Sequence, residues 1–251
     1  GIAPSRWRAL RLAIEDLMQT FPDAYPHGAG RLARLETLQA EHDRIPRDAA
    51  PEQFDAIIAQ FEALQREALL ANPLLDFERL LMIRRRADRL GLPMNYHGNT
   101  DIEPTGYENT LVALSPPAPD GAVTTVFQPT GDRFIGDLDL HYDAEKMLLS
   151  IPDEQGRWGV AELDLTDGTL TPLPLIAEPD VHNYDACYLP DERVVFTSTA
   201  PFVGVPCVGG RSEVANLYLL DLNGRIRRLT NDQDHNWCPE VLHDGRILYQ
   251  R

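Results

Sequence analysis

A tight turn followed by an apolar strand occurs three times in the second half of the chain. The turns are residues 143–146, 190–193 and 243–246, and the strands that follow are residues 147–150, 194–197 and 247–250. The spacing between successive copies is 47 and then 53 residues. Repeats of about 50 residues that each contain several strands are typical of β-propellers, in which one repeat forms one four-stranded blade. The repeat therefore predicts a propeller.

Short apolar runs broken by Gly, Pro, Asn and Asp extend this pattern over residues 73–251. We expect strands of a first unit near residues 80–127, complete units over residues 138–173 and 185–229, and half of a fourth unit at residues 239–250. The fold class is thus mainly β: a partial β-propeller of about 3.5 four-stranded blades, truncated within the fourth. Residues 88–109 are expected to form a long loop, of the kind that often carries function on a β scaffold.

The N-terminal part of the chain has a different pattern. Apolar residues recur at helical spacing over residues 7–21, 32–38 and 54–68, and prolines lie near the ends of these runs. This pattern predicts three amphipathic helices. We therefore expect a helical N-terminal region over residues 1–72, followed by the partial propeller over residues 73–251.

The composition limits the partners. There are 39 acidic and 23 basic residues, a net charge of −16, so the chain is acidic and nucleic acid is a poor partner, while cationic ligands are compatible. No run of about 18 apolar residues occurs, so no membrane span is expected. The chain begins without Met and ends in a predicted strand, and we expect it to be a piece of a longer protein.

Cysteines and nucleophile motifs narrow the chemistry. The cysteines are Cys187, Cys207 and Cys238, and neither CxxC nor CxxCH occurs. A Cys187–Cys207 disulfide would tie an insertion to its strand, and free thiols are the alternative. Gly-x-Ser-x-Gly is also absent, and no catalytic residue is predicted.

One polar pattern recurs with the repeat. His182-Asn183 and His235-Asn236 are 53 residues apart, and each pair precedes the first strand of its unit. The first strand of a blade is innermost, so we expect both pairs at the mouth of the central channel. With the neighbouring carboxylates, the predicted ligand-binding residues are His182, Asn183, Asp185, Asp234, His235 and Asn236.

Imidazole together with carboxylate suits either a divalent metal or a small polar ligand. If a metal binds, His182 and His235 are its predicted ligands. The alternative is structural: each His-Asn pair bonds the backbone of a turn, and the aromatic residues after them, Tyr184 and Trp237, pack between blades. The preceding unit has Ile135-Gly136 at this place, so the pattern is not present in every unit.

Two resemblances to known families lie in the same strand-rich part of the chain. Residues 216–232 resemble the end of a TolB-type (WD40-like) blade, and residues 188–198 resemble the start of the next motif. Residues 72–77, 184–188, 204–210 and 232–239 resemble exported proteins related to the hydrazine synthase alpha subunit, in its middle propeller domain. The second resemblance implies an exported or periplasmic protein. In that family the redox chemistry takes place at c-type haems. These 251 residues contain no motif for attaching such a haem, so the resemblance implies no synthase activity for this segment.

The leading functional hypothesis is a non-catalytic binding or scaffold module of a larger exported protein, with a protein partner or a small polar ligand and no cofactor in this segment. The first alternative is an enzyme with a metal or polar substrate at the channel mouth. The second is a subunit of a multihaem redox complex whose haems lie outside this segment.

Overall fold

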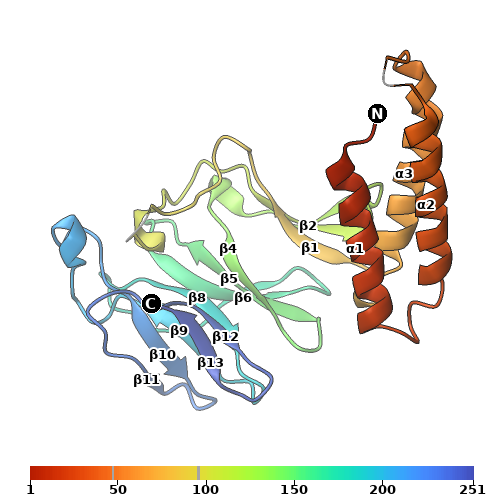
Figure 1. The fold of residues 1–251 in the computed structure, drawn as a ribbon. Coiled ribbons are helices and arrows are strands. Elements are labelled where there is room, and N and C mark those ends of the chain that lie inside the picture. Colours follow the sequence, from red (N-terminus) through yellow and green to blue (C-terminus); the bar gives the residue numbers. More distant parts are fainter. Residues whose placement is uncertain (47, 95–96) are drawn as a thin grey trace. The chain divides into compact units, whose positions relative to one another are not determined.

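The computed structural model describes residues 1–46, 48–94 and 97–251, so Asn95 and Tyr96 of the predicted loop lie outside the described residues. The chain divides into two compact units, which are described separately. The first contains residues 1–80 and 114–122, and the second contains residues 81–113 and 123–251. Figure 1 labels most of their helices and strands.

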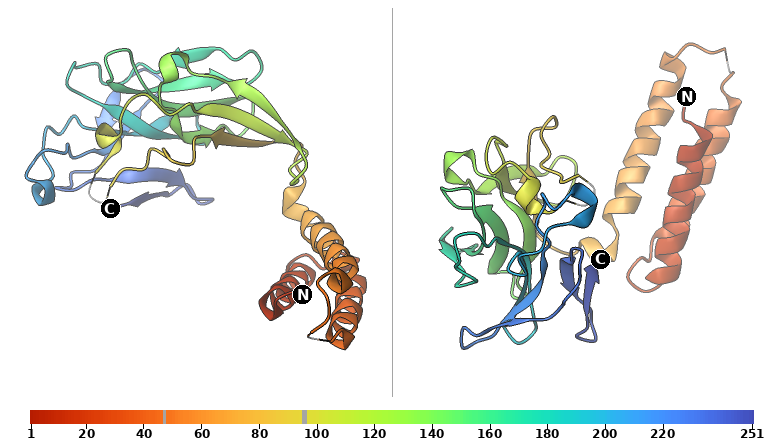
Figure 2. Two further views of the ribbon diagram at one scale, coloured as in Figure 1. Left: turned by 90° about the horizontal axis from the view of Figure 1, so that it is seen from above. Right: turned by 90° about the vertical axis from the view of Figure 1, so that its left-hand side faces the viewer.

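Three helices form most of the first unit and lie side by side in Figure 2. They pack through the apolar stripes that the sequence predicts, and the Trp7 ring meets Phe61 edge-on with ring centroids 4.7 Å apart. The Tyr25 hydroxyl donates to the Ala68 carbonyl at 2.9 Å, which fixes the connection between the first two helices against the third. The helices are α1 (Pro4–Thr20), α2 (Gly28–Arg44) and α3 (Glu52–Leu70), followed by the 3-10 turn η1 (Pro73–Leu75).

In the described part of the chain, thirteen strands form four antiparallel sheets. The first sheet contains β1 (Leu80–Arg84), β2 (Thr110–Ser115) and β3 (Ala122–Phe127). The second contains β4 (Gly136–Leu140), β5 (Lys146–Pro152), β6 (Trp158–Asp164) and β7 (Leu170–Pro172). The third contains β8 (Asn183–Tyr188), β9 (Val194–Ser198), β10 (Asn216–Leu220) and β11 (Ile226–Arg228). The fourth contains β12 (Trp237–Val241) and β13 (Ile247–Gln250), and the 3-10 turns are η2 (Asn99–Asp101), η3 (Thr130–Asp132) and η4 (Pro206–Val208).

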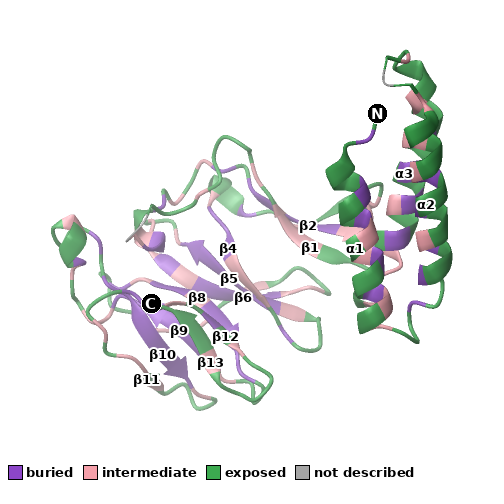
Figure 3. Cartoon of the chain, viewed as in Figure 1, coloured by how far each residue is buried: buried purple, intermediate pink, exposed green. Residues whose placement is uncertain are grey.

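Alternate residues of the third sheet pack in opposite directions, as the two-residue period of a strand requires. One set, which includes Tyr188 and Phe196, packs with Leu148 of the second sheet. The other set, which includes Val195, packs with Val241 of the fourth sheet. The third sheet is therefore buried on both faces at its centre. Its strands β9 and β10 are buried along their whole length, whereas the edge strand β11 is largely exposed (Figure 3).

The mainly β prediction with three N-terminal helices is confirmed, and the successive sheets are consistent with a partial propeller. The first sheet differs from the expected unit because it has three strands instead of four. Residues 85–109 contain one short 3-10 turn and otherwise no strand or helix among their described positions. Ile102 and Tyr107 of this loop are buried among the aromatic side chains of the second unit.

Candidate functional site

The first strands of the second, third and fourth sheets share a bulge. Within β4, β8 and β12 the register with the neighbouring strand shifts at the same place. One residue at each bulge has a left-handed backbone: Asp137 (φ 47°), Asp185 (φ 52°) and Cys238 (φ 49°). This conformation is unfavourable for residues other than glycine, and a bulge re-aims the side chain that it carries. Three side chains thus occupy equivalent, re-aimed positions.

Hydrogen bonds connect these positions from sheet to sheet. Ser150 Oγ accepts the backbone N–H of Asp185 at 2.8 Å and donates its hydroxyl to Asp137. The Asp185 carboxylate in turn accepts the backbone N–H of Cys238. Asn99 Nδ2 donates to Asp137 Oδ2 at 2.5 Å. We call Asp137 and Asp185 the acidic pair.

The two carboxyls of the acidic pair lie in a confined space, and both have raised pKa values. Burial raises the pKa of Asp185 to about 7, and the nearby charge of Asp137 adds to the effect. Burial also raises the pKa of Asp137, against the hydrogen bonds from Ser150 and Asn99 and the positive charge of Arg85. No ion pair to either carboxylate occurs among the described residues. The pair therefore holds protons more readily than two separate carboxyls would.

The acidic pair lines a cavity of about 440 Å³ in the second unit, which we call the acidic cavity. The predicted long loop contributes His97 and Asn99 to its wall, and Phe134 and Trp237 add aromatic rings. Arg85 also lines the cavity, but its guanidinium donates to two backbone carbonyls and to neither carboxylate. The volume lies within the usual range for small-molecule sites, roughly 300–1,000 Å³. The cavity thus combines aromatic surface with two carboxyls that form no ion pair among the described residues, and the charge of Arg85 acts on one of them, Asp137.

Two buried polar atoms beside this cavity have no hydrogen-bond partner among the described residues. They are the hydroxyl of Tyr184, a residue that is 1% exposed, and Nε1 of Trp237. A Cβ added to Gly98, which lines the cavity, would lie 2.6 Å from that hydroxyl. Burial raises the pKa of Tyr184, so the hydroxyl keeps its proton. Both atoms are hydrogen-bond donors that the described residues leave unused.

The two histidines of the predicted site have equivalent backbone bonds. His182 Nδ1 accepts the N–H of Trp158 at 3.1 Å, and His235 Nδ1 accepts the N–H of Ala215 at 3.2 Å. Each bond reaches the beginning of the third strand in the preceding sheet. Burial lowers the pKa of His182. The His235 ring stacks on Trp237 with centroids 4.5 Å apart.

The amides of the predicted site also bond nearby groups. Asn183 Nδ2 donates to the Ile176 carbonyl at 2.9 Å. Asn236 Nδ2 donates to Asp232 Oδ2 at 3.0 Å, and the backbone carbonyl of Asp234 accepts a bond from Asn216 at 3.4 Å.

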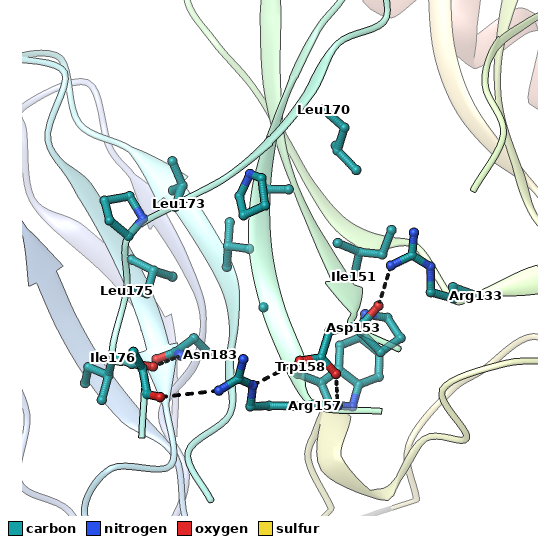
Figure 4. Close-up of a pocket in the computed structure, with 17 residues that line it drawn as sticks. Arg133, Ile151, Asp153, Arg157, Trp158, Leu170, Leu173, Leu175, Ile176 and Asn183 are labelled. Carbon is teal, nitrogen blue, oxygen red and sulfur yellow. Dashed lines mark hydrogen bonds and ion pairs between the residues drawn. The ribbon is translucent and has the colours of Figure 1, made fainter. Parts of the chain in front are cut away.

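The six predicted residues therefore do not line one cavity. Asp185 lines the acidic cavity, whereas Asn183 lines a second, mostly apolar cavity of about 460 Å³ (Figure 4). We call this second space the apolar cavity. His182, Asp234, His235 and Asn236 line neither.

The cysteines are free thiols, so the alternative to the predicted Cys187–Cys207 disulfide describes the structure. The physical reason is that Cys187 is buried in β8 against Val195 and Leu217, whereas Cys207 is exposed in η4. Among residues 1–46, 48–94 and 97–251, no group of three His, Cys, Asp or Glu side chains is arranged to hold a metal ion. No helix in the same residues could span a membrane.

Sequence reasoning missed Asp137, and the register of the strands explains why. Six residues separate the paired residues Leu140 and Met147 in the hairpin of the second sheet, but five separate Tyr188 and Val194 in the third. An alignment with one fixed offset of 47 therefore places Asp185 opposite the residue after Asp137. Aligning the first strands separately, with an offset of 48, would have found the acidic pair.

Comparisons with known proteins find only solved structures with a similar fold. No known protein family matches the chain, and no curated protein matches it. Among solved structures, TolB from Acinetobacter baumannii is 16% identical over 78% of this chain and 53% of its own, with a TM-score of 0.42. An oligogalacturonate lyase in complex with manganese is 14% identical over 68% of this chain and 43% of its own, with a TM-score of 0.43.

A putative TolB from Agrobacterium tumefaciens is 14% identical over 68% of this chain and 77% of its own, with a TM-score of 0.33. The chain thus spans about half the length of the first two of these structures. At these identities and TM-scores the likenesses say nothing of site or activity. The assignment of the fold rests on the repeated sheets and their equivalent bulges.

Proposed function

We propose that this chain is a propeller-type binding module whose ligand is a small molecule with a protonated amine, held by the acidic pair. The observation that carries the proposal is that Asp137 and Asp185 line one cavity and form no ion pair among the described residues. A carboxylate in a confined site is stabilised by an opposite charge or by a proton. An ammonium group would take the place of that proton.

The surroundings favour an organic ammonium over a divalent cation. Ca²⁺ and Mg²⁺ take roughly six to eight oxygen ligands, and the described residues offer no group of three acidic or imidazole ligands. An ammonium needs two or three acceptors and gains from an aromatic face within about 6 Å. The acidic pair supplies the acceptors and Trp237 supplies the ring.

The predicted metal site at His182 and His235 is a second candidate, which fits the enzyme alternative. Because Nδ1 of each neutral ring accepts a backbone N–H, its proton lies on Nε2, and a metal would have to displace one of these bonds. Metal analysis of the purified protein tests this candidate. A stoichiometric metal that is lost from a His182→Ala/His235→Ala double variant would favour it over the amine.

The broader context is also part of the proposal. We infer that the module belongs to a larger exported protein of about 3.5 or more blades and that it binds a protein partner or the small amine ligand. An absorbance scan of the full-length protein for a haem band tests the redox-complex alternative and the resemblance to hydrazine synthase relatives. Fractionation of the native cells tests export.

The binding proposal is tested with benzylamine, which combines an ammonium with an aromatic ring, and with benzyl alcohol, its neutral counterpart. Isothermal titration calorimetry at pH 8 is expected to detect benzylamine and not benzyl alcohol. Because a proton on Asp185 competes with the ligand, affinity should fall about tenfold from pH 8 to pH 6.

Asp185→Asn should weaken benzylamine by about tenfold or more, since it removes the charge but keeps the shape. Asp234→Asn is the matched control, because Asp234 lies outside the acidic cavity. Equal binding of benzylamine by Asp185→Asn and by the unaltered protein would refute the proposal, as would an equal affinity for benzyl alcohol.

A further inference from the structure

The acidic cavity also contains a positive charge that is not directly paired. Arg85, which follows β1, lines the cavity together with the acidic pair. Its guanidinium carbon lies over the Phe134 ring, 4.1 Å from the centroid. Arg85 forms no ion pair with any described carboxylate, although the negative charge of Asp137 acts on it. The cavity therefore presents a pair of carboxyls and a cation, and neither has a direct partner of opposite charge.

The hydrogen bonds of Arg85 hold its guanidinium in place and leave part of it unused. Nη1 donates to the Leu90 carbonyl at 2.7 Å, and Nη2 donates to the Ile135 carbonyl. Because each of these nitrogens carries two hydrogens, each retains one N–H that has no acceptor among the described residues. Arg85 is only half-buried, so these donors are not sealed inside the protein. A guanidinium with free N–H groups is a preferred partner of a carboxylate.

Arg85 and the acidic pair lie close together at the beginning of β4. Arg85 Nη2 bonds Ile135, and a Cβ added to Gly136 would lie 3.4 Å from the same nitrogen. Asp137 is the next residue. Burial lowers the pKa of Arg85, and the negative charge of Asp137 acts against this effect. One ligand can therefore contact both charges if only a few bonds separate its ammonium from its carboxylate, as in an α-amino acid.

The rest of the cavity wall favours an apolar group over a second ammonium. Ile83, Ile102 and Phe134 line it. In the described part of the wall, the acidic pair supplies the only carboxyls and Arg85 the only guanidinium. A second ammonium would have no acceptor pair of its own and would be repelled by Arg85. A diamine therefore fits less well than a molecule with one ammonium, one carboxylate and an apolar group.

We propose that the ligand of the acidic cavity is a zwitterionic α-amino acid with an apolar side chain. Its ammonium binds the acidic pair, its carboxylate binds Arg85, and its side chain contacts the aromatic wall. This inference rests on the proposed function, because it keeps the ammonium at Asp137 and Asp185. It adds Arg85 as the residue that determines specificity.

Three probes that share one aromatic ring separate the contributions of the two charges. Benzylamine carries the ammonium, phenylacetate carries the carboxylate, and phenylglycine carries both on one carbon atom. In isothermal titration calorimetry at pH 8, the tighter enantiomer of phenylglycine should bind about tenfold more tightly than benzylamine, because its carboxylate gains charge-assisted hydrogen bonds. Phenylacetate should bind about tenfold more weakly than benzylamine, because the acidic pair repels it. This comparison needs no variant and is unaffected by folding defects.

Arg85→Gln locates the contact with the carboxylate. In this variant the ratio of the phenylglycine and benzylamine affinities should fall from about ten to about one. Arg89→Gln is the matched control and should keep the ratio of the unaltered protein. Arg89 also lies over an aromatic ring, that of Tyr107, and donates to the Thr105 carbonyl, but it does not line the acidic cavity. Circular dichroism establishes that both variants are folded.

Two results would overturn the inference. One is that neither enantiomer of phenylglycine binds the unaltered protein more tightly than benzylamine does. The other is a tenfold advantage of phenylglycine that persists in folded Arg85→Gln. In either case, benzylamine binding that is weakened in Asp185→Asn would leave the proposed function intact. If neither benzylamine nor phenylglycine binds, the proposed function fails together with this inference, so the two failures are distinguishable.

Discussion

The second sheet contacts the third through the same kinds of hydrogen bonds, at equivalent places, as the third sheet contacts the fourth. The residues around these hydrogen bonds differ. We call each contact between successive sheets a joint. In both, a histidine Nδ1 accepts a backbone N–H from the preceding sheet. In both, an aspartate at a bulge is connected to the next bulge: Asp137 through Ser150, and Asp185 directly. The shared bonds hold the sheets together. The residues that differ supply the chemistry.

The two joints differ in the side chains that surround the shared hydrogen bonds. At the first joint, Asp139 Oδ2 also accepts the Tyr188 N–H at 2.8 Å, and His141 contacts Glu192 at 2.8 Å. At the second joint, Cys238 occupies the bulge position, so the row of carboxylates ends there. The acidic pair therefore arises at one joint only among the described sheets. Changes at equivalent positions test this distinction.

The largest difference is expected at the hydroxyls that face the bulges. Ser150→Ala leaves the buried Asp185 N–H and the Asp137 carboxylate without that partner, and should lower the free energy of unfolding by about 2 kcal/mol. Thr197 is the matched position, since it pairs with Tyr184 as Ser150 pairs with Gly136. Its hydroxyl bond to the Asp185 carbonyl is 3.4 Å long, so Thr197→Val should cost less than about 1 kcal/mol. Urea unfolding of both variants checks the difference, and equal losses would contradict it.

Asp185→Asn should change the pH dependence of stability. Because folding raises the pKa of Asp185 from 3.8 to about 7, its stabilising contribution is complete below pH 4 and is lost as pH rises through 7. The asparagine variant lacks this loss, so it should be more stable than the unaltered protein by about 1–2 kcal/mol at pH 8, after allowance for partial exposure. Urea midpoints measured from pH 4 to pH 8 provide the test. Parallel curves for the two proteins would contradict it.

A smaller effect on the free energy of unfolding is expected at His141, which belongs to the first joint. Burial acts to lower the pKa of His141, but hydrogen bonds to Asp143 and Glu192 outweigh it and raise the pKa. The protonated ring therefore stabilises the folded state fully below pH 6.5, and the contribution is lost as pH rises through the raised pKa. His141→Gln should cost about 0.5–1 kcal/mol at pH 6 and less at pH 9. A loss that does not change between these two pH values would exclude the ion pairs as its cause.

The smallest effect is expected at Tyr184. Its buried hydroxyl has no partner among the described residues, so Tyr184→Phe removes a polar group that gains nothing from burial. The variant should be as stable as the unaltered protein or more stable by up to about 1 kcal/mol, as thermal unfolding would show. Tyr188→Phe is the contrast, because the Tyr188 hydroxyl donates to Glu162 at 2.7 Å. A clear loss of stability in Tyr184→Phe would point to a partner for its hydroxyl.

The repeat and the strands could be predicted because turn residues and β-branched runs are local signals. The equivalence of His182 and His235 was also visible, since both precede a first strand at a spacing of 53 residues. The direction in which a side chain points was not visible, because a bulge shifts the alternation of a strand by one residue. That shift places Asp185 in one cavity and Asn183 in another.

Asp137 was missed for a related reason: one additional residue in a hairpin changes the offset between repeats. The three-stranded first sheet agrees with the predicted loop over residues 88–109, whose apolar side chains pack without forming a strand among the described residues. Local patterns thus predict the elements, whereas register and loop length determine which side chains meet.

The central claim is that the acidic pair binds an ammonium group in place of a proton. Its most direct test is the titration of the Asp185 carboxyl, followed by carbon NMR with and without benzylamine. We expect a pKa of about 7 for Asp185 in the free protein and a fall of at least one pH unit when benzylamine is saturating. A pKa near the ordinary value of 3.8, or one that benzylamine leaves unchanged, would contradict it.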